Sequence, residues 1–209
     1  MKFDSIIWDW NGTLLNDVDV VVGVINQLLG DRNLALLTVE RYLAVFTFPV
    51  RQYYEQIGFD FTIEPYEIPA MQFITLYNKA VETCDLHVEV IPILSRLQSA
   101  GYRQFILSAM EQEQLEKTVD ENGINDFFED LFGLTDHFAA SKIANGLSLI
   151  RKHGLNPERT LLVGDTIHDF EVAQAIGCNC VLVAKGHQSK ERLVATGTHV
   201  LDSLHEFEF

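Results

Sequence analysis

The chain has 209 residues, of which 47% are hydrophobic, so it is long enough to bury the core of one domain that carries a large insertion. Its 15 Lys and Arg face 30 Asp and Glu, which gives a formal net charge of -15. A charge of this sign repels nucleic-acid phosphates and anionic lipid surfaces, so we expect neither nucleic acid nor a membrane as a partner. Since no signal peptide or membrane-spanning stretch is recognisable, the expected location is the cytoplasm.

The first part of the chain predicts one strand and then a series of helices. Residues 3–9 should form a buried strand, because the letters IIW make a short apolar run before a glycine turn. Apolar residues then recur at helical spacing, and Asp17 is the expected N-cap of the first helix. The four expected helices cover residues 17–30, 38–46, 50–57 and 69–83. The helical spacing of apolar residues therefore predicts that residues 16–86 form an all-helical insert.

From Val90 onward, expected helices and strands alternate. The helices cover residues 90–100, 112–121, 141–153 and 169–176, and the strands cover residues 102–108, 131–134, 160–163 and 179–184. Such alternation is typical of an α/β fold in which a parallel sheet is flanked by helices. We expect a core domain made of residues 1–15 and 87–209, interrupted by the helical insert.

Polar residues that follow the strands are the candidates for a site, because ligands of such sheets bind beyond the carboxyl ends of the strands. Asp9, Ser108 and Asp165 each follow an apolar run, and Lys142 begins a helix after the third strand. Two carboxylates, an ammonium group and a hydroxyl suit a divalent cation and a phosphoryl group. Taken singly, Ser108 is better interpreted as a helix cap and Lys142 as a solvated helix residue.

The stretch GDTIHD at 164–169 is more specific. Asp165 ends a strand and Asp169 begins a helix four residues later, so both carboxylates can face one site. A role for Asp169 as an N-cap alone stays open. His168, between them, is expected to pack locally rather than to act as a base.

These motifs together resemble those of the haloacid dehalogenase superfamily of hydrolases. The resemblance is carried by DWNGT at 9–13, by Ser108, by Lys142 and by GDTIHD at 164–169, in the family's order and spacing. It is most similar to members of the phosphoglycolate-phosphatase type, and it implies a Rossmann-like core with a helical cap domain at 16–86. It further implies a small phosphorylated metabolite as the substrate and Mg²⁺ as the cofactor.

The resemblance also implies a role for each matched residue. Asp9 would be the nucleophile that forms an aspartyl-phosphate, and Lys142 would offset phosphoryl charge. The implied metal ligands are Asp9, the backbone carbonyl of Asn11 and Asp165, and Asp169 would hold metal-bound water or Lys142. The implied substrate-binding residues are Gly12, Thr13, Ser108, Ala109 and Lys142.

Asn11 departs from the pattern of the phosphatases that this sequence resembles. They usually carry a second aspartate at this position, which protonates the leaving oxygen and then activates water. An amide donates and accepts hydrogen bonds but exchanges no proton. Metal binding through the backbone should survive, whereas acid/base assistance worth roughly 10²- to 10⁴-fold is in doubt.

Three other functions stay open at this point. The chain could be a phosphometabolite-binding or regulatory protein that kept the site and lost turnover. Hydrolysis of a carbon–phosphorus bond, as in phosphonoacetaldehyde hydrolases, would need a cap lysine, for which Lys79 is the one candidate in the insert. Carbon–halogen cleavage ranks lowest, because GDTIHD is typical of a metal site. Arg41 or Arg51 could meet a second anionic group of the substrate.

Overall fold

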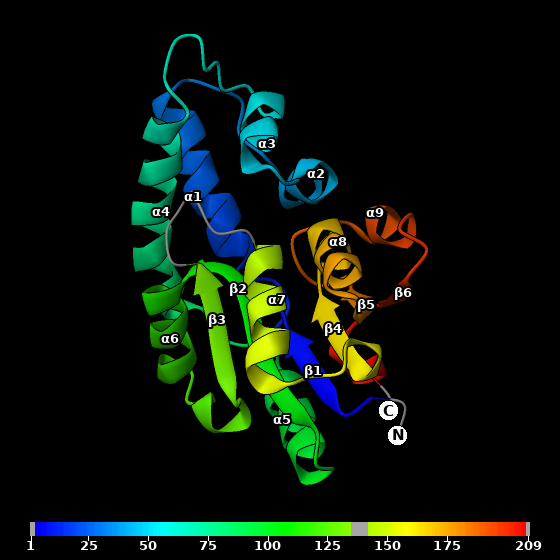
Figure 1. The fold of residues 1–209 in the computed structure, drawn as a ribbon. Helices are drawn as coiled ribbons and strands as arrows, with labels where there is room; N and C mark the ends of the chain where they lie inside the picture. Colours follow the sequence, from blue (N-terminus) through cyan, green and yellow to red (C-terminus); the bar gives the residue numbers. More distant parts are fainter. Residues whose placement is uncertain (1–2, 135–141, 208–209) are drawn as a thin grey trace.

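The computed structural model describes residues 3–134 and 142–207, which form an α/β fold around a parallel sheet. The sheet has six strands in the order β3-β2-β1-β4-β5-β6 (Figure 1). Their bounds are β1 (Ser5–Trp8), β2 (Arg103–Glu111), β3 (Asp130–Leu134), β4 (Thr160–Gly164), β5 (Asn179–Val183) and β6 (His199–Leu201). The predicted fold class is therefore confirmed.

Strand β1 lies at the centre of the sheet and is buried on both faces. Ile7 pairs with Phe105 of β2 on one side and with Leu162 of β4 on the other. Because successive side chains of a strand point to opposite faces, Ile7 and Trp8 pack into different clusters. The residue that follows Trp8 therefore emerges at the middle of the sheet's carboxyl edge.

Helices cover both faces of the sheet. On the Trp8 face lie α5 (Val90–Ser99) and α6 (Gln112–Glu121), and on the Ile7 face lie α7 (Lys142–His153) and α8 (Ile167–Ile176). The shorter elements are α9 (Lys190–Val194), η2 (Asn125–Phe127), η3 (Pro157–Arg159) and η4 (Leu204–Glu206). None of the described helices is long and apolar enough to cross a membrane.

The insert between β1 and β2 is helical, as predicted. Its elements are α1 (Val18–Asp31), α2 (Val39–Val45), α3 (Val50–Gln56), α4 (Glu67–Ala80) and η1 (Val81–Thr83). Figure 1 shows it at the end of the sheet toward which the strand arrows point. One apolar cluster continues from Trp8 and Trp10 into α1 and α2, so the insert packs directly on this edge of the sheet.

The structure differs from the predicted elements in three places. Strand β2 continues three residues beyond Ser108, and α8 begins at Ile167 rather than at 169. Strand β6 and helix α9 were not predicted, because three and five residues are too few to display a hydrophobic period. The predicted start of the seventh helix, residue 141, lies outside the described residues.

Candidate active site

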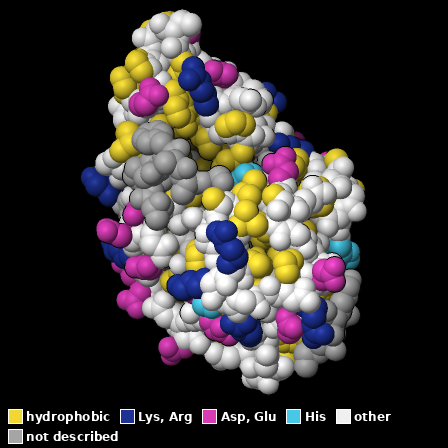
Figure 2. All heavy atoms as spheres, in the orientation of Figure 1, with side chains coloured by type: hydrophobic (Ala, Val, Ile, Leu, Met, Phe, Trp, Pro, Cys, Tyr) yellow, Lys and Arg dark blue, Asp and Glu magenta, His cyan; other side chains and the backbone are white. Residues whose placement is uncertain are grey.

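A cavity of about 380 Å³ lies between the carboxyl edge of the sheet and the helical insert. Figure 2 shows apolar side chains gathered near the junction of these two parts. The residues that line the cavity include Asp9, Lys142, Asp165 and Asp169, which come from three different segments of the chain. The sheet thus collects into one place the polar residues that the sequence distributes over 160 positions.

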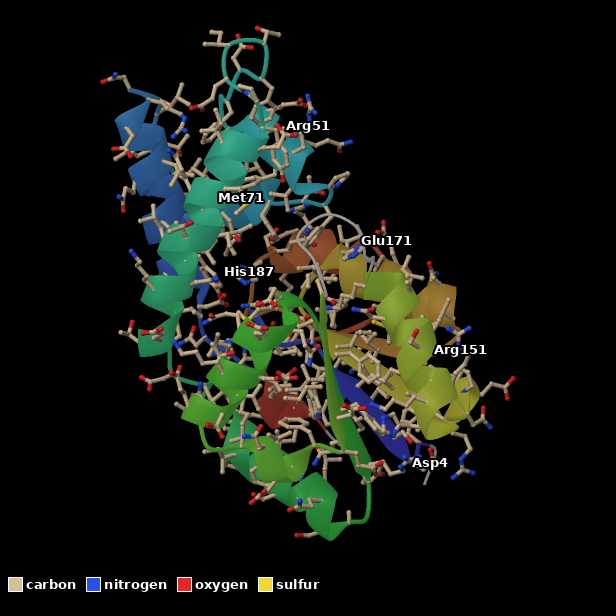
Figure 3. The ribbon with its side chains drawn as sticks, turned by 60° about the vertical axis from the view of Figure 1, so that its left-hand side comes forward. Asp4, Arg51, Met71, Arg151, Glu171 and His187 are labelled. Carbon is tan, nitrogen blue, oxygen red and sulfur yellow. The ribbon has the colours of Figure 1, made fainter. Side chains whose placement is uncertain are left out.

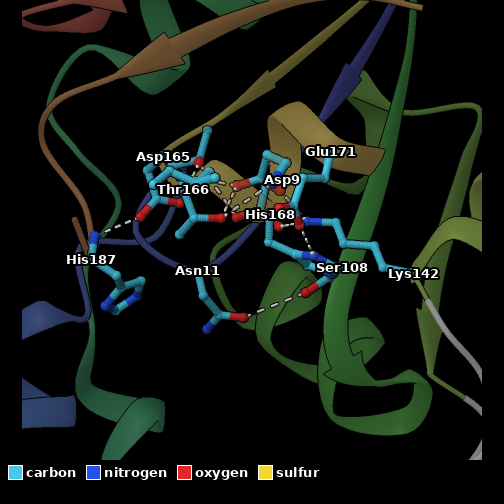
Figure 4. Close-up of polar contacts among 12 residues, drawn as sticks. Asp9, Asn11, Ser108, Lys142, Asp165, Thr166, His168, Glu171 and His187 are labelled. Carbon is cyan, nitrogen blue, oxygen red and sulfur yellow. Dashed lines mark hydrogen bonds and ion pairs between the residues drawn. The ribbon is translucent and has the colours of Figure 1, made fainter. Parts of the chain in front are cut away.

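Lys142 joins two of these carboxylates. Asp9 follows β1 directly, and its N–H donates to the carbonyl of Val163 in β4 at 2.8 Å. The Nζ of Lys142 donates to Oδ1 of Asp9 and, at 2.6 Å, to Oδ1 of Asp169 (Figure 4). Asp169 also caps α8 through a reciprocal pair of bonds with Thr166, so capping and the contact with Lys142 occur together.

Asp165 approaches the same point from the end of β4. Its carboxylate accepts a hydrogen bond from Oγ1 of Thr13 at 3.0 Å and from the backbone N–H of His187 at 2.5 Å. Asp9, Asp165 and Asp169 are all buried, and each places one carboxylate oxygen within 4.8 Å of the others. Three converging carboxylates are the kind of oxygen donor set that binds a hard divalent cation.

The charges of this cluster are unevenly compensated. Burial raises the pKa of Asp9 well above its ordinary value, since neighbouring carboxylates add to the effect of burial and Lys142 only partly opposes it. Burial likewise raises the pKa of Asp165 to about 6. Burial also tends to raise the pKa of Asp169, but the contacts with Lys142 and Thr166 outweigh burial and lower this pKa. A cation bound between Asp9 and Asp165 would offset the charge that Lys142 leaves uncompensated, so the residues present fit a divalent metal.

Two glycines make room for Asp165. A Cβ atom at Gly186 would lie 2.1 Å from Oδ2 of Asp165, and one at Gly12 would lie 2.5 Å from the same oxygen. Gly12 also has a φ of +74°, which disfavours residues with a side chain. The close approach of backbone to carboxylate explains why the DWNGT turn carries glycine at this position.

Asp17 is the centre of a second polar network beside the cluster. Its fully buried carboxylate accepts hydrogen bonds from Gly12 N (2.9 Å), Nδ2 of Asn11 (3.0 Å) and the hydroxyl of Tyr77 (2.6 Å), and lies 3.1 Å from Nε2 of His187. The expectation that Asp17 caps α1 is wrong for the side chain, which makes no capping bond. A buried charge requires stronger compensation than a single helix terminus offers.

His187 and Asp17 form a buried ion pair. Burial alone would lower the pKa of His187, but Asp17 raises it to about 9. Burial opposes ionisation of Asp17. The contacts with His187, Tyr77 and Asn11 outweigh burial, so the pKa of Asp17 is lowered. The other ring nitrogen of His187 lies 2.9 Å from the hydroxyl of Tyr42 in α2, so this residue links the sheet to the insert. Figure 3 shows His187 at their junction.

Sequence reasoning missed His187, Gly186, Asp17 and Tyr77 as site residues. The signal for the first two was present, because the apolar run of β5 is followed by the letters KGHQ, at another strand end. The two others carried no such signal. The contact between Asp17 and Tyr77 spans 60 positions and depends on how α1 packs against α4.

The remaining sequence-predicted residues also lie at this edge. Asn11 and Ala109 line the cavity, whereas Gly12, Thr13 and Ser108 lie outside its described lining. The hydroxyl of Ser108 donates to Oδ1 of Asn11 at 3.4 Å and accepts from the N–H of Met110.

His168 contacts Glu171 of its own helix, but its ring also stacks on Phe48 of the insert at 4.7 Å and lines the cavity. Among the described residues that line the cavity, Lys142 is the single Lys or Arg. Arg41, Arg51 and Lys79 are exposed on the insert, and Arg51 pairs with Glu55.

Comparison with known proteins identifies the family. Residues 6–183 match the model of the haloacid dehalogenase-like hydrolases, which covers most of the chain. The chain therefore belongs to this family.

The relatives of this chain are named for different activities. The phosphoglycolate phosphatase of Synechococcus elongatus is 22% identical over 91% of this chain and 88% of its own. The tyrosine-protein kinase PtkA of Mycobacterium tuberculosis is 31% identical, over 53% of this chain and 38% of its own. A hydrolase structure from Deinococcus radiodurans, with bound phosphate and sodium, has 20% identity and a TM-score of 0.75 over 98% of this chain and 93% of its own, which shows the shared fold.

The ion pair of His187 predicts a pH-dependent stability. Because the pKa of His187 is raised from 6.5 to about 9, its contribution is complete below pH 6.5 and is lost as the pH rises through 9. In EDTA, the free energy of unfolding should fall over this range by on the order of 3 kcal/mol. Denaturant titrations should show this slope in the wild type and in His168→Gln, and a flatter one in His187→Gln. Equal slopes in all three proteins would contradict the assignment.

Proposed function

We propose that this chain is a Mg²⁺-dependent phosphatase that hydrolyses a small phosphorylated metabolite through an aspartyl-phosphate on Asp9. The observation that carries the proposal is the convergence of Asp9, Asp165, Asp169 and Lys142 in one cavity at the carboxyl edge of the sheet. Membership of the hydrolase family and the similarity to a phosphoglycolate phosphatase support the class of substrate.

The proposed metal ligands are the carboxylates of Asp9 and Asp165 and the backbone carbonyl of Asn11, with Asp169 acting through water. When bound, Mg²⁺ supplies positive charge that neutralises the phosphoryl oxygens and the surrounding carboxylates. The raised pKa values of Asp9 and Asp165 support this set, because they mark negative charge that the described side chains leave uncompensated. Thr13 and His187 hold Asp165 in place by hydrogen bonds.

Asp9 is the proposed nucleophile. One of its oxygens attacks phosphorus, the bond from phosphorus to the leaving oxygen breaks with its electron pair, and water later attacks the aspartyl-phosphate to release phosphate. Lys142 contacts the Asp9 carboxylate and keeps its positive charge, since Asp169 and Asp9 raise its pKa against the effect of burial. The ammonium group is therefore placed to stabilise phosphoryl oxygens. Ser108, Ala109 and the Gly12–Thr13 backbone are proposed to bind the same group.

Asn11 stands where an acid/base would be required. Its NH₂ group donates to Asp17 at 3.0 Å and to the hydroxyl oxygen of Tyr77 at 2.6 Å. The amide therefore satisfies a buried carboxylate instead of transferring protons. We infer that leaving groups depart without a proton from residue 11, which favours substrates whose leaving groups are stable as anions.

Residues 16–86 are proposed to act as the cap domain that selects the substrate. The insert contributes Val21 and Ile25 of α1, Phe48, and Phe73 and Tyr77 of α4 to the lining of the cavity. A phosphoryl group held at Asp9 would therefore direct the rest of the substrate toward the insert. The carbon–phosphorus cleavage considered above finds no support, because Lys79 is not among the described lining residues.

A phosphometabolite-binding or regulatory protein is the second candidate, and Asn11 is the observation that favours it. Such a protein would keep the metal and phosphate contacts of Asp9, Asp165 and Lys142 without turnover. Binding alone therefore does not separate the two functions, whereas turnover does.

The metal site predicts stabilisation by Mg²⁺. At a hundredfold excess over its Kd, a ligand of the folded state adds about 2.7 kcal/mol to the free energy of unfolding. Asp165→Asn should lose most of the rise in melting temperature that Mg²⁺ causes, because the amide removes a charged ligand at nearly constant volume. The same change at exposed Asp202, which pairs with Lys190, should leave the rise intact. An unchanged rise in Asp165→Asn would exclude this residue from the metal site.

The role of position 11 predicts a gain of function. In Asn11→Asp the new carboxyl group would face Asp17, which raises its pKa and favours the protonated acid. Alkyl phosphates should then be hydrolysed roughly 10- to 1,000-fold faster, as measured by phosphate release with Mg²⁺. Asp9→Asn should release no phosphate, and peptide mass analysis should exclude deamidation at Asn11-Gly12.

The binding protein would replace the enzyme as the proposed function if wild type and Asn11→Asp bound Mg²⁺ and phosphate analogues and yet left both aryl and alkyl phosphates intact.

A further inference from the structure

The part of the cavity wall that the insert contributes is aromatic. Phe46 packs on Tyr53 with ring centroids 5.3 Å apart, and Phe73 stacks on Tyr77 at 5.6 Å with nearly parallel planes. All four rings line the cavity, together with Phe48. They come from the segments around α2 and α3 and from α4, so both sides of the insert contribute.

This aromatic wall begins next to the proposed metal site. Phe46 lies 5.6 Å from the ring of His187, whose N–H binds Asp165, and Phe48 stacks on His168 between the two carboxylates of GDTIHD. A group attached to a phosphoryl at Asp9 would therefore extend along these rings. Phe46, Phe48 and Phe73 are only half-buried, which leaves ring surface open to a ligand.

The charges of the described lining favour a ligand without a second anionic group. Lys142 is its single Lys or Arg, and this residue already binds Asp9 and Asp169. Glu111 adds negative charge to the same lining, where Asp17 and His187 form an ion pair with each other. Because Lys142 and His187 are already paired with carboxylates, a substrate carboxylate placed among these groups would lose its hydration without gaining a free cation, whereas an aromatic ring would gain contact with the wall.

Resting on the proposed phosphatase activity, we propose that the substrate is an aryl phosphate, whose ring binds against Phe46, Phe48 and Phe73. The chemistry at Asn11 leads independently to the same class. As Asp9 bonds to phosphorus, the bond to the phenolic oxygen breaks and the electron pair leaves with the phenoxide, which takes a proton from water. A phenol, with a pKa near ~10 as in tyrosine, leaves as an anion far more readily than an aliphatic alcohol.

Binding of phosphonates tests the ring site apart from chemistry, because their carbon–phosphorus bond resists attack. Calorimetry in saturating Mg²⁺ would compare methylphosphonate, benzylphosphonate and phosphonoacetate, the last being an analogue of phosphoglycolate. Benzylphosphonate should bind roughly 10- to 100-fold more tightly than methylphosphonate, owing to burial of its ring. Phosphonoacetate should bind no more tightly than methylphosphonate.

Matched variants locate the ring. Phe46→Leu and Phe48→Leu should each weaken benzylphosphonate about five- to tenfold and leave methylphosphonate unchanged, because aromatic contact is lost and the phosphoryl site is kept. Phe128→Leu, at a half-buried phenylalanine outside the described lining, should change neither affinity.

The outcomes separate this inference from the function on which it rests. Equal affinity for methylphosphonate and benzylphosphonate, in a protein that releases phosphate with Mg²⁺, would overturn the aryl substrate and leave the phosphatase standing. Binding of no phosphonate, without any phosphate release, would overturn both. Turnover of free phosphotyrosine or of a phosphotyrosyl peptide would support the aryl class and would distinguish a small molecule from a protein side chain.

Discussion

The site depends on one buried charge, the carboxylate of Asp17. A carboxylate without access to water must be surrounded by donors, and here the donors come from three distant parts of the chain. Gly12 and Asn11 follow β1, Tyr77 belongs to α4, and His187 follows β5. Their shared acceptor holds the turn after β1, the insert and the sheet in one arrangement, and it requires a donor at position 11.

That requirement connects stability to chemistry. A carboxylate at position 11 would lie about as close to Asp17 as the present amide nitrogen, 3.0 Å away, so one of the two groups would have to take a proton. The amide avoids this repulsion but gives up proton transfer. The neighbouring cluster has the opposite imbalance, because Lys142 compensates Asp169 and leaves Asp9 and Asp165 in need of a cation. The two networks thus differ in how their charge is neutralised.

The sequence was sufficient for the fold class and for the site residues that follow β1, β2 and β4, but Gly186 and His187, which follow β5, were missed. Asp9 and Asp165 could be predicted because an apolar run fixes each strand and the parallel sheet fixes where its end lies. The role of Asp17 was predicted wrongly, because an aspartate directly before a helix is typical of a helix cap. Only the packing of α1 on α4 brings its side chain to Tyr77. The aromatic lining of the cavity was equally invisible, since residues on helices of the insert meet there only after folding.

If Asp9 is the nucleophile, it becomes phosphorylated, and the amide at position 11 supplies no base to speed hydrolysis of the aspartyl-phosphate. Rapid acid quench during turnover of a reactive aryl phosphate, followed by peptide mass analysis, tests both parts at once. We expect a phosphate-sized mass increase on the peptide that contains Asp9, accumulating before steady release of phosphate and absent from Asp9→Asn. Phosphate on another peptide, or turnover without any phosphorylated Asp9, would contradict it.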